Sequence, residues 1–119
     1  MTSYEMAVGL AKALDSKKGL NIKVLKTEEL TTLADYFVLC TATSNTQVKA
    51  MSDACEEAAE QNGEQAHHIE GHHDGTWLLM DFSSVLVHVF TDEARKFYDL
   101  ERLWADAQEV DLSEILVKE

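Results

Sequence analysis

The chain of 119 residues contains no proline, only five glycines, two cysteines and ten basic side chains. Without proline-rich or glycine-rich stretches, it offers no obvious linker, and its length suits one domain. Cys40 and Cys55 fall inside apolar segments. They are therefore typical of small buried hydrophobes in a reducing compartment, and not of a disulfide framework. No apolar run is long enough to cross a bilayer and no charged-then-apolar leader opens the chain, so we expect a cytoplasmic protein without a membrane partner.

Basic residues are scarce relative to acidic ones: 22 Asp and Glu against 10 Lys and Arg give a formal net charge of −12. Binding to a phosphate backbone uses Lys and Arg to release counterions, so direct nucleic-acid readout is disfavoured. An acidic surface favours a partner that presents basic side chains. The same charge is equally typical of a well-solvated surface that has no partner.

Hydrophobic periodicity divides the chain into helices and strands in the order α-β-β-α-β-β-β-α. Ser3 is predicted to cap a helix whose apolar positions continue to Leu14, and a second helix opens at Ser44, whose spacing to Gln47 matches a capping box. Residues 36–41 (YFVLCT) are apolar on both faces, which indicates a strand covered on both sides. We expect a single α/β or α+β domain with a mixed five-stranded sheet flanked by helices.

The most informative stretch is 76–90, TWLLMDFSSVLVHVF, where two apolar runs flank Ser83–Ser84. A two-residue turn predicts an antiparallel hairpin in which Phe82 opposes Val85, and the register continues outward from that pair. One face is then wholly apolar and should lie on the core. The opposite face is mixed, and its predicted pairs are Asp81 with Leu86, Leu79 with His88, and Trp77 with Phe90.

The mixed face has two interpretations. Trp and Tyr dominate binding hot spots, so an exposed Trp77 beside Leu79 and Phe90 would be a candidate anchor for a partner. Alternatively, the same side chains form a second core layer. Residues 97–104 continue an apolar helical pattern, interrupted near Asp99, and Trp104 on this pattern is typical of core packing.

Side chains that carry chemistry do not assemble into a recognisable catalytic motif. His67, His68, His72, His73 and Asp74 are ligand types for zinc, but their spacing fits no helix face or knuckle, so we predict no specific metal site. Two-metal phosphoryl chemistry requires converging carboxylates, and neither a glycine-rich phosphate loop nor an Asp-x-Asp strand occurs. The thiols lie in apolar contexts that keep them inert. We therefore predict no catalytic residues and no cofactor.

Three segments together resemble the ribosomal silencing factor family, also called iojap-like proteins. They are DYFVLCTATSNTQVKA (35–50), EGHHDGTWLLMDFSSVLVHVF (70–90) and ARKFYDLERLWADA (94–107). The similarity runs from about residue 3 to residue 107, with the segments in the same order and spacing. The chain departs from the family pattern at Ala42, where glycine is usual, and at Ser83–Ser84, where Gly-Asp is usual.

The resemblance implies a nucleotidyltransferase-like fold that lacks catalytic residues. It also implies binding to the large ribosomal subunit through its fourteenth protein, which blocks joining of the small subunit and represses translation under nutrient limitation. Carried onto this chain, the partner-binding positions are Trp77, Leu79, Asp81, His88, Tyr98 and Leu100.

Two alternatives stay open. One is a metal-dependent nucleotide-handling enzyme that works through Asp35, Asp74 and Asp81. The other is a homodimer that uses the same hairpin face. We place the domain at residues 1–107 and expect residues 108–119 to be an acidic tail, a loose amphipathic turn or disordered.

Overall fold

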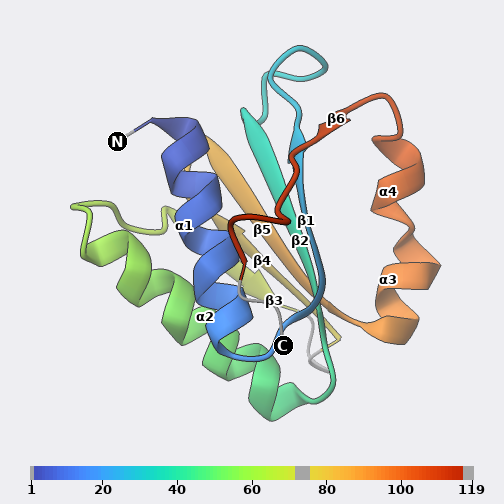
Figure 1. Cartoon of the computed structure of the whole chain (residues 1–119). Coiled ribbons are helices and arrows are strands. Elements are labelled where there is room, and N and C mark those ends of the chain that lie inside the picture. Colours follow the sequence, from blue (N-terminus) through green and yellow to red (C-terminus); the bar gives the residue numbers. More distant parts are fainter. Residues whose placement is uncertain (1, 72–75, 117–119) are drawn as a thin grey trace.

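The computed structural model describes residues 2–71 and 76–116, and it confirms an α+β domain built on one mixed sheet (Figure 1). The sheet has six strands in the order β3-β4-β5-β2-β1-β6. β2 and β5 run parallel, and the other neighbouring strands are antiparallel. The element bounds are α1 Ser3–Ser16, β1 Leu20–Lys26, β2 Tyr36–Ala42, α2 Asn45–Glu60, β3 His68–Gly71, β4 Trp77–Asp81, β5 Val85–Thr91, α3 Asp92–Tyr98, α4 Leu100–Leu103 and β6 Gln108–Glu109.

Helices cover both faces of the sheet, α1 and α2 on one side and α3 and α4 on the other (Figure 1). β2 lies between these layers, and every one of its residues is buried, as its apolar sequence predicted. The larger core lies under α1 and α2 and includes Leu10, Met51, Val38 and Val87. A smaller second core lies under α3 and α4 and includes Phe37, Leu39 and Phe90.

Local capping explains where the two long helices begin. Thr2, and not Ser3 as the sequence suggested, caps α1: its hydroxyl accepts from the Glu5 amide at 3.1 Å, and the Glu5 carboxylate accepts from the Thr2 amide at 3.0 Å. Ser44 caps α2 as predicted, because its Oγ accepts from the Gln47 amide at 3.1 Å. The hydroxyl of Ser3 instead donates to Asp35 at 2.6 Å, which joins α1 to the start of β2.

Residues 108–116 correct the predicted strand count. Gln108 and Glu109 pair with Lys26 and Leu25 as β6, which is why the sheet has six strands and not five. Val110, Leu112 and Leu116 pack against the larger core. A two-residue strand has too little alternation to be detected in sequence, and its apolar side chains are held by the neighbouring core and not by a helix of their own.

Candidate partner-binding surface

The β4–β5 hairpin has the register that the sequence predicted. Trp77 pairs with Phe90, Leu79 with His88, Met80 with Val87 and Asp81 with Leu86. At the turn, the Phe82 amide donates to the Val85 carbonyl at 2.9 Å. Ser83 has φ 73°, a conformation that glycine adopts more readily, and the Asp81 carboxylate accepts from its amide at 2.7 Å. Asp81 therefore supports the serine turn.

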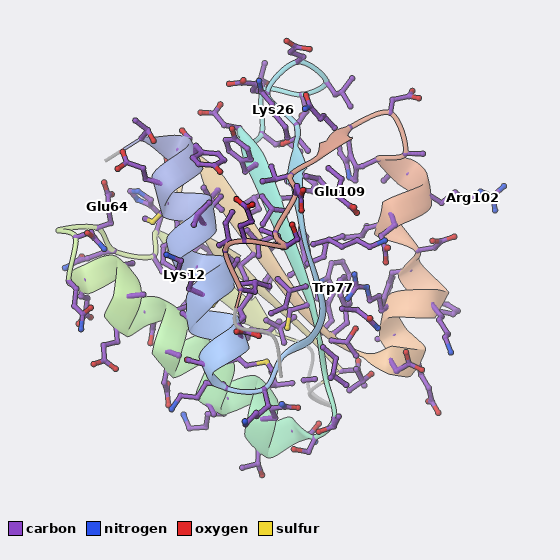
Figure 2. All side chains as sticks on the ribbon, in the orientation of Figure 1. Lys12, Lys26, Glu64, Trp77, Arg102 and Glu109 are labelled. Atoms are coloured by element: carbon purple, nitrogen blue, oxygen red, sulfur yellow. The ribbon has the colours of Figure 1, made fainter. Side chains whose placement is uncertain are left out.

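The mixed face of the hairpin is mostly covered by α3 and α4, but its edge at Trp77 remains partly exposed to solvent. Trp77 lies on the side of the sheet that faces α3 and α4 (Figure 2). Its ring centroid is 4.5 Å from that of Tyr98, 5.3 Å from Phe90 and 5.9 Å from His88. Trp77 packs against the second core but stays partly exposed. We call Trp77, His88, Phe90 and Tyr98 the aromatic cluster.

His88 is the most enclosed polar member of the aromatic cluster, with only 5% of its surface exposed. Its Nδ1 accepts from the Trp77 indole Nε1–H at 3.2 Å. Among the described residues, its Nε2 has no hydrogen-bond partner. Burial lowers the pKa of His88 to about 4, because the charged imidazolium would be desolvated. The ring is therefore neutral near pH 7, with its proton on Nε2.

Helices α3 and α4 are held over this layer by caps and by a charged network. The Thr91 hydroxyl accepts from the Ala94 amide at 3.4 Å, and Asp92 and Glu93 lie in the first turn, where the helix dipole favours anions. Asp99 adopts a left-handed conformation with φ 48° and separates the two helices, at the position where the sequence predicted an interruption.

Arg95 links α3 to the sheet. Its guanidinium donates to the Thr41 hydroxyl and to the Glu101 carboxylate, both at 2.8 Å, and Lys23 donates to Glu101 at 2.6 Å. Burial alone would raise the pKa of Glu101, but the hydrogen bonds from Lys23 and Arg95 outweigh it and lower that pKa. The network therefore fixes the position of α3 and α4, and with them the side chain of Tyr98.

The outer side of α3 and α4 exposes three large apolar side chains, of which the predicted site included only Tyr98. Phe97 is 81% exposed, Leu103 71% and Tyr98 36%. The Phe97 and Tyr98 rings meet edge to face, with centroids 5.1 Å apart. We call Phe97, Tyr98 and Leu103 the outer patch. Arg102, beside it on α4, points away from the sheet (Figure 2).

A signal for the outer patch was available in the sequence. Residues 97–104 hold more large apolar side chains than one face of two short helices can bury, so some of them had to face solvent.

The six predicted partner-binding residues occupy different environments. Trp77, Leu79 and Asp81 follow one another on the same face of β4, and all three are partly exposed. Tyr98 joins Trp77 in the aromatic cluster, and Leu100 packs against the second core. His88 is buried beneath this group. Asp81 lies four residues along β4 from Trp77, about 13 Å at the usual rise per residue.

The described histidines, carboxylates and thiols that were considered for metal binding or catalysis lie outside the aromatic cluster. Among residues 2–71 and 76–116, no three His, Cys, Asp or Glu side chains are grouped so as to hold a metal ion. His72, His73 and Asp74 lie outside the described residues, so the prediction made for them stays a prediction. Cys40 and Cys55 are buried, and burial raises the pKa of each thiol to about 12. None of the helices in the described ranges combines the length and apolar character that a bilayer crossing requires.

Together these features define an acidic α+β domain with a mixed sheet, whose distinctive surface is the partly exposed aromatic cluster beneath α3 and α4.

Comparison with known proteins agrees with the resemblance seen in the sequence. The family model described as "Ribosomal silencing factor during starvation" matches residues 1–119. A ribosomal silencing factor of Bacillus subtilis is 39% identical over 102 residues, which cover 86% of each chain. The chloroplastic Iojap protein of Zea mays is 33% identical over 106 residues, 89% of this chain and 46% of the maize protein.

Solved structures agree as well. A crystal structure of a protein from Chromobacterium violaceum superposes with a TM-score of 0.85 at 34% identity, and the match covers 95% of this chain and 93% of that one. The chain belongs to the ribosomal silencing factor family.

Proposed function

We propose that this protein binds the large ribosomal subunit through its fourteenth protein and blocks joining of the small subunit by its bulk. Translation is thereby repressed when nutrients are limiting. Family membership indicates translation regulation and ribosome association. The single observation that supports this docking site is the partly exposed Trp77, packed at 4.5 Å against Tyr98, whose ring in turn meets that of the exposed Phe97. Aromatic side chains that are rigid and partly exposed are the usual anchors of protein interfaces.

The charge of the chain supports a basic protein as the partner. The net charge of −12 attracts basic surface and repels bare RNA, so docking on a ribosomal protein is favoured over docking on the phosphate backbone. In this proposal the contact surface consists of Trp77, Leu79, Asp81, Tyr98 and Leu100, extended by the outer patch, with His88 behind it. The protein works in the cytoplasm, where subunit joining occurs.

A subunit-joining assay tests the proposed activity. Purified large subunits are incubated with the protein, small subunits are added, and joined ribosomes are separated on a sucrose gradient. We expect the joined fraction to fall as the protein approaches saturation of the large subunits. Normal joining at saturation would overturn steric silencing.

Substitution of Trp77 tests the docking surface. We expect Trp77→Ala to weaken large-subunit binding by about 2 kcal/mol or more, which is roughly a 30-fold loss of affinity. Co-sedimentation with large subunits measures it, and denaturant unfolding of each variant separates lost contact from lost stability, since Trp77 also packs on the second core. Leu33→Ala is the matched control, because Leu33 is 65% exposed in the loop before β2. Equal binding by both variants would place the contact elsewhere.

The alternative functions predict different outcomes in the same experiments. A homodimer formed through the same hairpin face would show a doubled mass in light scattering without large subunits, and Trp77→Ala would abolish it. A nucleotide-handling enzyme would work through Asp35, Asp74 and Asp81. Asp74 lies outside the described residues, whereas Asp35 accepts from Ser3 and Asp81 accepts from the turn amide of Ser83. Asp35→Asn should therefore leave subunit joining inhibited as strongly as before.

A further inference from the structure

His88 is a polar side chain buried among aromatic rings, and packing alone does not explain its presence there. It is 5% exposed, and its ring lies among aromatic neighbours, with centroids 5.3 Å from Phe37 and 5.9 Å from Phe90. A leucine or phenylalanine would fill such a site without burying polar atoms. An imidazole buries two nitrogens, and among the described residues one of them, Nε2, has no partner. Buried polar groups are normally paired, so an unpaired one is retained at a cost in stability.

The other ring nitrogen of His88, Nδ1, makes a specific hydrogen bond with Trp77. An indole N–H is only a donor, and the Trp77 Nε1–H donates to His88 Nδ1 at 3.2 Å. With Nδ1 as acceptor, the proton of the neutral ring must sit on Nε2. The opposite tautomer would set two N–H donors against each other. The arrangement therefore requires one tautomer and one orientation of the indole.

We propose that His88 is a positioning residue: through Nδ1 it locks the Trp77 ring in the orientation that the partner meets, without touching the partner itself. Trp77 stacks on Phe90 at 5.3 Å with 27° between the rings and packs against Tyr98 at 4.5 Å. The directional hydrogen bond to His88 then sets which edge of the indole faces outward. A side chain fixed before binding loses less conformational freedom at the interface, so the affinity rises.

This inference rests on the proposed function only for its effect on affinity, and the geometry can be tested without ribosomes. In ¹⁵N-labelled protein, the Trp77 and Trp104 indole N–H groups give separate signals, and Trp104 is the internal control. His88→Leu removes the acceptor and keeps apolar bulk, whereas His88→Asn keeps an oxygen acceptor near the position of Nδ1. We expect hydrogen exchange of the Trp77 indole to accelerate in His88→Leu and to recover in His88→Asn, with Trp104 unchanged.

Binding to large subunits gives the second readout. We expect His88→Leu to lose about 3- to 10-fold in affinity, the range for releasing one immobilised side chain, and His88→Asn to stay near the unsubstituted protein. An equal loss in both variants would show that His88 acts by packing alone and would overturn the proposal. If the unsubstituted protein fails to bind large subunits, the proposed function fails, and the indole exchange still decides whether His88 positions Trp77.

A measurement on the unsubstituted protein covers the case in which His88→Leu does not fold. The ¹⁵N shifts of the His88 ring report the tautomer, and a coupling across the hydrogen bond joins Trp77 Nε1 to His88 Nδ1. We expect Nδ1 to be unprotonated, Nε2 to be protonated, and the coupling to be observed. A proton on Nδ1 at neutral pH, or rapid exchange of the Trp77 indole, would overturn the proposal.

Discussion

At the scale of single residues, environment decides what each titratable side chain can do. Burial lowers the pKa of His88 to about 4, whereas an exposed imidazole has a pKa near 6.5. The same desolvation raises the pKa values of Cys40 and Cys55 to about 12. These three groups are therefore held uncharged at neutral pH. Cys40 and Cys55 lie in the larger core, and the His88 ring packs against Phe37 and Phe90 of the second core.

The depressed pKa of His88 predicts a loss of stability in mild acid. Above about pH 6.5 neither the folded nor the unfolded state is protonated at this ring. As the pH falls below that value the unfolded state takes up a proton, while the folded state resists until about pH 4. The free energy of unfolding should therefore decrease between these values, by on the order of 3 kcal/mol in total. Urea denaturation across this range measures it. His88→Asn should flatten the decrease, and identical slopes in both proteins would contradict the assignment.

The buried thiols predict chemical inertness. Cys40 and Cys55 are buried, and thiols with raised pKa values carry almost no thiolate at neutral pH. We expect a chromogenic disulfide reagent to label neither cysteine in the folded protein and both after denaturation. Rapid labelling of the folded protein would show that one of them is activated or accessible.

At the scale of secondary-structure elements, α1 and the turn that follows it contain two glycines that differ in the space available for a side chain. A Cβ added at Gly9 would meet nothing within 4 Å, whereas one added at Gly19 would lie 2.5 Å from Cys40 Sγ and 3.0 Å from the Leu14 carbonyl oxygen. Gly9 lies in the interior of α1, while Gly19 is the point at which the chain passes closely over β2 on its way into β1. The first glycine weakens its helix, and the second permits a close approach.

We expect the matched alanine substitutions to change stability in opposite directions. Gly9→Ala should stabilise the protein by about 0.5–1 kcal/mol, because glycine in a helix interior carries excess conformational entropy. Gly19→Ala should destabilise it by about 1–3 kcal/mol, because overpacking forces the Cys40 side chain and the backbone to shift. Thermal or urea denaturation of the two variants measures both effects. A destabilised Gly9→Ala or an unaffected Gly19→Ala would contradict this account of the turn.

At the scale of the whole molecule, part of the negative charge lies on the face of the sheet away from the aromatic cluster. α2 carries Asp53, Glu56, Glu57 and Glu60 on the side opposite α3 and α4 (Figure 1). Charges on that side cannot touch a partner docked at the aromatic cluster. They contribute only to the long-range field, which acts over about 8 Å at physiological ionic strength.

Neutralising these four acids should therefore slow association and leave dissociation unchanged. Replacing them with Asn and Gln reduces the net charge from −12 to −8. We expect the association rate with large subunits to fall at low salt and to vary less with salt, while Trp77→Ala acts mainly on the dissociation rate. Surface plasmon resonance at two salt concentrations measures both rates. A salt-independent association rate for the unsubstituted protein would rule out electrostatic steering.

Several features of this protein were accessible from local sequence alone. The hairpin register followed from strict alternation on either side of two turn residues, since a slip of one residue would have placed Trp77 and Asp81 in the larger core. β2 followed from an apolar run on both faces, and the start of α2 from the spacing of Ser44 and Gln47. Each of these depends on interactions between residues that are close in the chain or directly paired.

Other features depend on contacts between distant parts of the chain. The solvent exposure of the mixed face of the hairpin depends on α3 and α4, which pack over it. These helices are held in place by the hydrogen bond from Arg95 to Thr41, which lies 54 residues earlier in the chain. That docking buries His88, leaves the margin of Trp77 open and turns Phe97 and Leu103 to solvent. Alternation in the sequence determined which side chains share a face. Only the tertiary structure decided which of them are covered, because burial depends on what packs against a face and not on the order of residues within it.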